Sequence, residues 1–290
     1  MRFLNPKTDF AFKKIFGSEN SRDILISFLN AVMHLDHPYL IQEVDILDPY
    51  LAPKIQGVKD TYLDVRVRDE AGRSYVIEMQ VLNVAGFEKR ILYNACKAYV
   101  NQIGRGEHYT ELCEVIAITI TDFVMFEELA GIQSRFRMRA EENPEIYHGD
   151  LELIFVELPK FRKSEEELES VYDKWLYFLK TAGDLKAIPV KLSQEPAIVH
   201  AFEIANKAGL TEDELEDQER REIFIQDQRG ALQYAATVGE RKGEIQGEIK
   251  GRIKAKQEVA KSMLEKGMAK ELVAELTGLS QEELQLLEKP

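Results

Sequence analysis

Alternating and unbroken apolar runs predict strands in the first 160 residues. Three stretches with strand character lie at 41–47, 62–68 and 74–82, and two further apolar runs lie at 115–120 and 151–158. The run at 115–120, VIAITI, is short and rich in β-branched residues, which is typical of a strand buried on both faces. We therefore expect a sheet that is covered on both sides at this strand.

Apolar positions at helical spacing flank these strands. They recur in two helices within the first 33 residues and again over 87–103. Capping boxes at Ser164 and Thr211 indicate further helix starts, and no convincing strand follows residue 196. The expected order is helix, three strands, helix, strand and strand. The pattern therefore predicts a mixed α/β core followed by an all-helical C-terminal region.

The stretches at 62–68 and 74–80 predict a β-hairpin. A three-residue loop, Glu70-Ala71-Gly72, puts glycine at the left-handed position that such loops favour, and Asp64 then faces Glu78 across the hairpin. A loop of two or four residues would instead move Glu78 away from Asp64. Alternation assigns the residues of the first arm to two faces: Leu63, Val65 and Val67 on one, and Asp64, Arg66 and Arg68 on the other.

Two opposed carboxylates call for a compensating positive charge. Directly opposed Cβ atoms lie ~5 Å apart, and like charges there are destabilising. A hard divalent cation such as Mg²⁺ takes oxygen ligands, and Gln80 on the same face can offer an amide oxygen or orient a water. The alternative is a solvated charged surface, in which Arg66 pairs with Glu78 for ~0–1 kcal/mol. The pattern alone leaves both interpretations open.

The charge balance limits how such a site would meet nucleic acid. The net charge is −13 and the pI is near 5.1, so the global field opposes the electrostatic attraction on which phosphate binding largely depends. An activity on DNA must therefore rest on a local site and on metal ions.

Cysteine usage and hydropathy indicate the compartment. Cys96 and Cys113 are the only cysteines and form no metal or disulfide framework, which is typical of a reduced, cytoplasmic protein. No apolar run approaches the ~20 residues that a membrane span needs, and the N-terminus lacks the apolar segment of a secretory signal. We expect no membrane partner.

The C-terminal third is charged and helical in pattern. Glycines spaced by four over 239–251 alternate with charged residues, which favours an exposed, partly helical linker over a nucleic-acid contact through its basic side chains. The segments 269–276 and 280–287 resemble a helix-turn-helix pair, but the second begins Gln281-Glu282-Glu283. This acidic start favours a helical hairpin or a homo-oligomerisation element over a DNA reader.

Four blocks of sequence resemble the recombination-promoting nuclease family, also described as PD-(D/E)xK nuclease family transposases. They are NPKTDFAFKKIFG at 5–17, KDTYLDVRVRDEAGRSYVIEMQ at 59–80, KRILYNACKAYVNQIGRGEHY at 89–109 and VIAITITDF at 115–123. The tail at 260–287 is also similar to endings common in that family. The resemblance implies a restriction-endonuclease-like α-β-β-β-α-β core that hydrolyses DNA with Mg²⁺ or Mn²⁺.

The resemblance also assigns roles to residues. The family's acidic residue of the second core strand falls on Asp64, its glutamate of the third strand on Glu78 and its closing position on Gln80. The wider superfamily has lysine at the closing position, so another cation is expected to replace it, with three candidates: Lys59, Lys89 and Lys97.

Three further residues match the family's motifs, each with an alternative. Asp9 is expected to help hold a metal ion, or else to pair with Lys13 one helical turn away. Arg90 and Tyr93 are expected to contact phosphate; otherwise Arg90 supports the carboxylates and Tyr93 belongs to the core.

We divide the chain into four expected parts: a nuclease-like core at 1–160, a helical extension at 161–230, a charged glycine-repeat helical linker at 231–267 and a helix-turn-helix-like hairpin at 268–290. The expected function is a divalent-metal-dependent DNA endonuclease associated with recombination or mobile elements. The alternatives are an inactive DNA-binding or protein-interaction module that keeps this fold, and an α/β domain of unrelated purpose.

Overall fold

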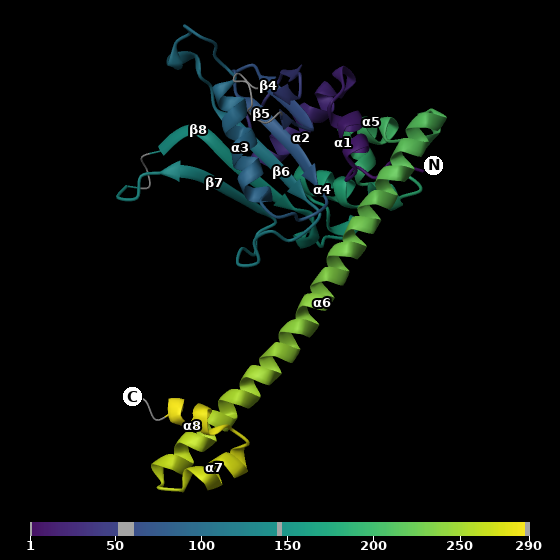
Figure 1. Cartoon of the computed structure of the whole chain (residues 1–290). Coiled ribbons are helices and arrows are strands. Elements are labelled where there is room, and N and C mark those ends of the chain that lie inside the picture. The colour runs from purple at the N-terminus through teal and green to yellow at the C-terminus, as the bar shows by residue number, and fades with distance from the viewer. Residues whose placement is uncertain (1, 52–60, 144–146, 288–290) are drawn as a thin grey trace. The chain divides into compact units, whose positions relative to one another are not determined.

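A six-stranded mixed sheet forms the centre of the first of two structural units (Figure 1). The computed structural model describes residues 2–51, 61–143 and 147–287, and its units comprise residues 1–226 and 227–290. The strand order is β1-β4-β5-β6-β8-β7, with β6 parallel to β5 and β8 and the other pairs antiparallel. The strands are β1 (Val44–Leu47), β4 (Val65–Asp69), β5 (Ser74–Gln80), β6 (Val115–Thr121), β7 (Gln133–Arg139) and β8 (Tyr147–Glu157). Two short strands, β2 (Tyr50–Leu51) and β3 (Thr61–Tyr62), pair with each other.

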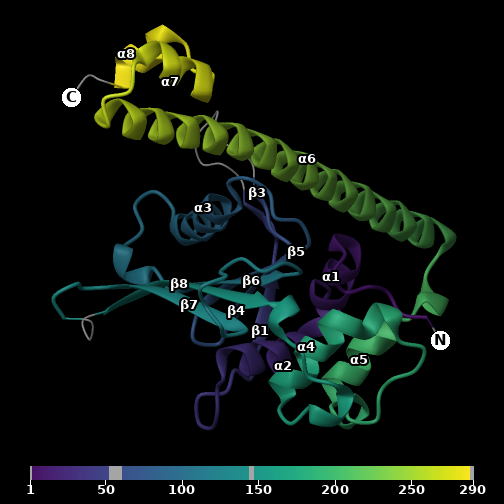
Figure 2. The same cartoon turned by 90° about the horizontal axis from the view of Figure 1, so that it is seen from below.

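Helices cover both faces of this sheet (Figures 1 and 2). Helix α3 packs on one face, while α1, α2, α4 and α5 gather on the other. The helices of the first unit are α1 (Asp9–Phe16), α2 (Arg22–Met33), α3 (Phe87–Val100), α4 (Val171–Thr181), α5 (Pro196–Ile204) and the first turns of α6 (Glu212–Glu265). The predicted mixed α/β core and helical C-terminal region are confirmed.

Strand β6 is buried along its whole length, as its β-branched sequence predicts. Its side chains alternate between two clusters: Ile116, Ile118 and Ile120 join the large core under α1, α2, α4 and α5, whereas Val115 and Ala117 join the smaller core under α3. The strand that pairs with β5, and so lies beside Glu78, is therefore covered on both faces.

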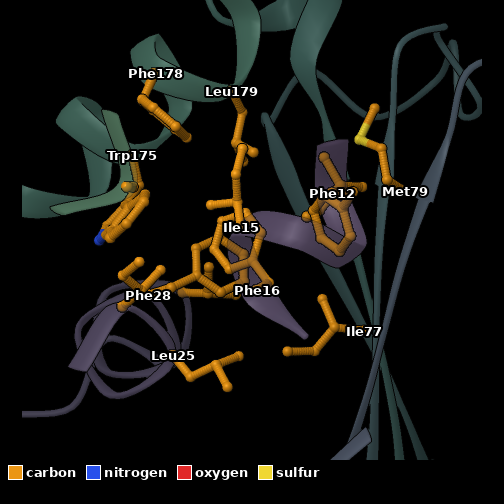
Figure 3. Close-up of a cluster of buried hydrophobic side chains, with 14 of the residues drawn as sticks. Phe12, Ile15, Phe16, Leu25, Phe28, Ile77, Met79, Trp175, Phe178 and Leu179 are labelled. Carbon is orange, nitrogen blue, oxygen red and sulfur yellow. The ribbon is translucent and has the colours of Figure 1, made fainter. Parts of the chain in front are cut away.

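Helix α1 is held by aromatic packing in the large core (Figure 3). Phe12, Ile15 and Phe16 are fully buried, and the Phe16 ring lies 5.2 Å from that of Phe28 and 5.8 Å from that of Trp175, centroid to centroid. Ile77 and Met79 of β5 face the same cluster. The side chains therefore fix α1 against the strand that carries Glu78.

Two local expectations differ from the structure. Strand β7 was not predicted, because its sequence QSRFRMR mixes charged and apolar residues and it pairs only with β8 at the edge of the sheet. The capping box at Ser164 forms but opens only a single 3-10 turn, and α4 begins after Ser170, whose side chain accepts a hydrogen bond from the N–H of Asp173. The box at Thr211 does begin a helix, α6.

The second unit consists of the remainder of α6 followed by α7 (Lys270–Thr277) and α8 (Gln281–Leu287). Its small core contains Ala260, Val273, Leu279 and Leu284. Helix α7 is capped at its C-terminus by Gly278, which takes the left-handed conformation with φ 66°. Helix α6 is continuous through the glycines at 239–251, where only a partly helical linker was expected. None of the described helices has the length and apolar character needed to span a bilayer.

Candidate active site

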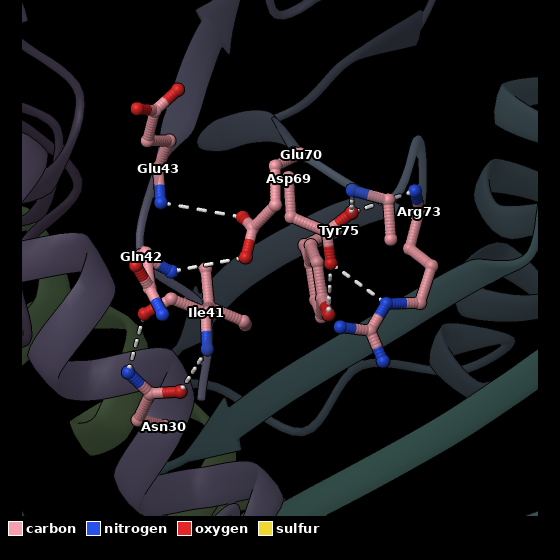
Figure 4. A network of polar contacts seen from close by, with 9 residues as sticks. Asn30, Ile41, Gln42, Glu43, Asp69, Glu70, Arg73 and Tyr75 are labelled. Carbon is pink, nitrogen blue, oxygen red and sulfur yellow. Dashed lines mark hydrogen bonds and ion pairs between the residues drawn. The ribbon is translucent and has the colours of Figure 1, made fainter. Parts of the chain in front are cut away.

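The carboxylate of Asp69 stabilises the turn of the β4–β5 hairpin (Figure 4). Its Oδ1 accepts the backbone N–H groups of Ala71 and Arg73, and its Oδ2 accepts the Tyr75 hydroxyl at 3.0 Å and the Arg73 Nε at 2.7 Å. Four donors on one buried side chain leave the turn little freedom. They therefore hold the two arms of the hairpin in one alignment.

That alignment confirms the predicted register. Val65 pairs with Ile77 and Val67 pairs with Tyr75, as a three-residue loop requires. Gly72 has φ 85°, the left-handed conformation expected at the end of such a loop. Continuing this register by one residue brings position 64 opposite Glu78.

Strand β4 begins at Val65, and Asp64 lies in a bend just before it. Because of the bend, Leu63 packs in the smaller core with Val76, so the prediction that it shares a face with Val65 and Val67 is wrong. The backbone N–H of Met79 donates instead to Oδ2 of Asp64 at 2.9 Å. The carboxylate of Asp64 thus takes the place of a strand-to-strand hydrogen bond.

Glu78 is a buried acid on β5, with 9% of its surface exposed. Asn94 on α3 donates from Nδ2 to Glu78 Oε1 at 2.8 Å. Burial raises the pKa of Glu78, and the Asn94 hydrogen bond, Arg90 and Lys13 oppose this only in part. A solvated surface lattice of Arg66 and Glu78 is therefore wrong, because Glu78 is removed from solvent and bonds to Asn94.

Asp64 is also largely buried, with 17% of its side chain exposed. Burial raises its pKa to about 7; the Met79 hydrogen bond and the charge of Lys13 act downward, and the charges of Glu78 and Asp9 act upward. The site therefore holds two carboxyl groups whose ionised forms are both disfavoured by their surroundings.

Lys13 on α1 joins Asp64 to Asp9. Its Nζ lies 3.4 Å from Asp64 Oδ1 and 2.7 Å from Asp9 Oδ1, while Arg221 of α6 reaches Asp9 Oδ2 at 2.7 Å. Burial acts to raise the pKa of Asp9, but Lys13 and Arg221 lower it overall. Burial acts to lower the pKa of Lys13, and the two carboxylates raise it overall. The alternative pairing of Asp9 with Lys13 thus forms.

Both polar atoms of the Gln80 side-chain amide form hydrogen bonds. Arg90 of α3 donates from Nη2 to Gln80 Oε1 at 2.7 Å, and Gln80 Nε2 donates to the carbonyl oxygen of Leu82 at 3.3 Å. The Arg90 guanidinium also lies 5.2 Å from the centroid of the Phe87 ring. Arg90 is therefore held beside the acids by the neutral side chain at the closing position.

A cavity of about 1030 Å³ opens at these residues. Most of the expected site residues line it: Asp9, Asp64, Glu78, Gln80, Lys89, Arg90 and Tyr93. Tyr93 is 41% exposed, so it is not a core residue. Lys97 is buried and does not line the cavity, and Lys59 lies outside the described residues.

The donor set fits a hard divalent cation. Asp64 and Glu78 supply carboxylate oxygens, and the hydrogen bonds from Met79 and Asn94 use one oxygen of each. Within the described part of the chain no three acidic, histidine or cysteine side chains converge as a complete metal cage. Mg²⁺ does not need one, because it commonly keeps several waters and binds through one or two carboxylates plus substrate phosphate.

Sequence reasoning missed three residues of this site. Asn94 lies on the buried face of α3 together with Ile91 and Ala95, and a polar residue on such a face is a signal that could have indicated its role in the site. The sequence indicates Lys13 only as the partner of Asp9, because its contact with Asp64 depends on how α1 packs across the sheet. Arg221 is distant in sequence, and no local pattern indicates its contact with Asp9.

Comparison with known families gives two matches. Residues 6–235 match the PD-(D/E)XK nuclease family transposases, and residues 254–289 match the C-terminal HTH domain of the Rpn/YhgA-like nuclease family. Searches of curated proteins and of solved structures give no significant match. The first match covers most of the chain, including β4, β5 and α3. The chain therefore belongs to the PD-(D/E)XK nuclease family of transposases.

Proposed function

We propose that the protein is a divalent-metal-dependent DNA endonuclease associated with recombination or mobile elements. One observation carries the proposal: Asp64 and Glu78, two largely buried carboxylates, lie on neighbouring arms of one hairpin and line one cavity. Isolated buried charges are costly, so a pair of them favours a bound cation. Family membership supports the nuclease class.

In this proposal Asp64 and Glu78 bind Mg²⁺ or Mn²⁺ through their oxygens. The backbone N–H of Met79 and the amide of Asn94 orient the two carboxylates, so the ligands are arranged before the ion arrives. When bound, such an ion polarises phosphate oxygens and lowers the pKa of a coordinated water. Asn94 is thus proposed to position Glu78.

Lys89 and Arg90 are proposed to receive the DNA backbone. Both line the cavity from α3, so they bring positive charge to the point where a phosphate would lie. This local charge matters because the whole chain carries a net charge of −13. The match to an HTH domain at 254–289 supports DNA as the partner of the second unit as well.

The net reaction is hydrolysis of one phosphodiester. The oxygen of a water forms a bond to phosphorus as one P–O bond to a sugar breaks, and the two water protons end on the departing sugar oxygen and in solvent. The products are a phosphate monoester and a sugar hydroxyl. The protein contributes orientation of the acids, positive charge at the phosphate and a confined site.

Nicking of supercoiled plasmid tests the proposal. Wild-type protein should nick with Mg²⁺ or Mn²⁺ but not with a chelator, and Asp64→Asn and Glu78→Gln should each lower the rate by at least about 100-fold. Asp45→Asn is the matched control, because Asp45 is an exposed acid on β1 away from the cavity.

Two outcomes contradict the proposal. Equal nicking by the wild type and both variants would assign the activity to a contaminant. Absence of nicking, together with salt-sensitive DNA binding, would favour the inactive DNA-binding module that keeps this fold.

A further inference from the structure

The proposed active site contains a cation whose role is not accounted for by metal binding. Lys13 lies on α1, outside the hairpin and outside α3, yet its ammonium contacts the carboxylates of both Asp64 and Asp9. The inference below rests on the proposed nuclease function and concerns what this ammonium does in it.

The other positive groups that line the cavity form no ion pair with Asp64 or Glu78 among the described residues. Arg90 donates to Gln80, and Lys7 pairs with Asp122 at 3.3 Å. Arg221 pairs with Asp9. Among the ion pairs that the described residues form, the pair with Lys13 is the one that involves Asp64 or Glu78. Gln80 is neutral, so it cannot supply a charge itself.

The fold holds Lys13 at this point. Thr8 caps α1 by accepting the N–H of Ala11, and Phe12 and Ile15 anchor the helix in the large core. The Lys13 side chain remains 41% exposed, so a ligand from solvent can reach it. Lys13 does not itself line the cavity, but both of its carboxylate partners, Asp9 and Asp64, do, so its ammonium lies beside the cavity.

We propose that Lys13 is a catalytic residue that donates a hydrogen bond to a non-bridging oxygen of the scissile phosphate. Negative charge grows on these oxygens as water adds to phosphorus, and a fixed ammonium stabilises it. Lys13 keeps its protons throughout, so it acts by charge and by hydrogen bonding. It supplies the cation that the closing position, Gln80, lacks.

Asp9 has a matching role in this arrangement. Its two oxygens contact Lys13 and Arg221, each at 2.7 Å, so it is shared by two cations. The Asp9 carboxylate can therefore orient the Lys13 ammonium while Asp64 binds the metal ion. Asp9 is then a positioning residue, which acts through Lys13.

The test compares Lys13→Met and Lys13→Arg with Lys14→Met in three measurements. These are the plasmid-nicking rate with Mn²⁺, Mn²⁺ affinity by calorimetry and melting temperature. Lys14 is the matched control, because it is the next residue on α1 and pairs with Glu214 rather than with Asp64. A fourth variant, Lys13→Ala, is assayed for nicking with and without added ethylamine, a small ammonium that can enter the space left by the truncated side chain.

The proposal expects Lys13→Met to nick about 100-fold more slowly, with Mn²⁺ affinity equal to or above that of the wild type. Ethylamine should restore part of the rate of Lys13→Ala, Lys13→Arg should keep part of the wild-type rate, and Lys14→Met should nick normally. The rise in affinity would follow from removing a cation that competes for Asp64.

Other outcomes overturn it. If Lys13→Met nicks normally while Asp64→Asn does not, the inference fails and the nuclease function stands. If Lys13→Met loses Mn²⁺ affinity and thermal stability together and ethylamine restores nothing to Lys13→Ala, the role of Lys13 is structural. If the wild type itself does not nick, the proposed function fails and the inference fails with it.

Discussion

The carboxylate of Asp64 accepts a hydrogen bond from the backbone N–H of Met79 across 2.9 Å, where the pairing of β4 and β5 ends. This contact joins an acid of one arm to the backbone beside the acid of the other, because Met79 follows Glu78. The relative position of the two carboxylates is therefore set by the hairpin itself.

Asp64→Asn should change how stability depends on pH. Burial raises the pKa of folded Asp64 from 3.8 to about 7, so this group's contribution to stability is complete below pH 3.8 and is lost as pH rises through 7. Asparagine does not ionise. In the presence of a chelator, the free energy of unfolding of the variant relative to that of the wild type should therefore rise by about 1–3 kcal/mol from pH 5 to pH 8, as measured by urea unfolding. A constant difference across this range would contradict the raised pKa.

Asn94→Ala should destabilise the protein and slow nicking. The change removes the donor to Glu78 Oε1 and leaves a buried carboxylate with one partner fewer. A hydrogen bond to a charged group contributes about 1.5–3 kcal/mol, so unfolding at pH 8 without metal should show a loss of this order. Cys96→Ser is the control, since Cys96 is exposed on the same helix. If both variants unfold alike, Asn94 does not support Glu78.

Divalent metal should stabilise the folded protein. For an affinity of ~1 mM, 10 mM Mg²⁺ contributes about 1–2 kcal/mol, or a rise of about 2–6 °C in melting temperature. Asp64→Asn and Glu78→Gln should abolish this rise, and Asp45→Asn should keep it. A rise that survives in all three variants would locate the ion elsewhere.

Local patterns predicted the hairpin well because its turn and its alternation are both local. Gly72 and the pairing of Val65 with Ile77 follow from a short stretch of chain. The side of Leu63 was mispredicted, because alternation assumes a regular strand and the bend at Asp64 interrupts it. The contact of Lys13 with Asp64 depends on how α1 packs in the core, which no periodicity contains.

The glycines of α6 should limit its stability. An added Cβ at Gly243, Gly247 or Gly251 meets no atom within 4 Å, so alanine fits without strain. Each replacement should stabilise the helix by about 0.5–1 kcal/mol, and hydrogen exchange over 239–255 should slow in the triple variant. Gly278→Ala is the opposite case, because φ 66° strains alanine and should loosen the small core around Leu279. Unchanged exchange in the triple variant would contradict this.

Crystals grown with Mn²⁺ test the central claim most directly. The account predicts an anomalous peak between the side chains, with one oxygen of Asp64 and one of Glu78 each about 2.1–2.3 Å from the ion. In Glu78→Gln crystals the peak should weaken or vanish. Carboxylates on opposite sides of the sheet, or well-ordered carboxylates with no peak at saturating Mn²⁺, would contradict the account.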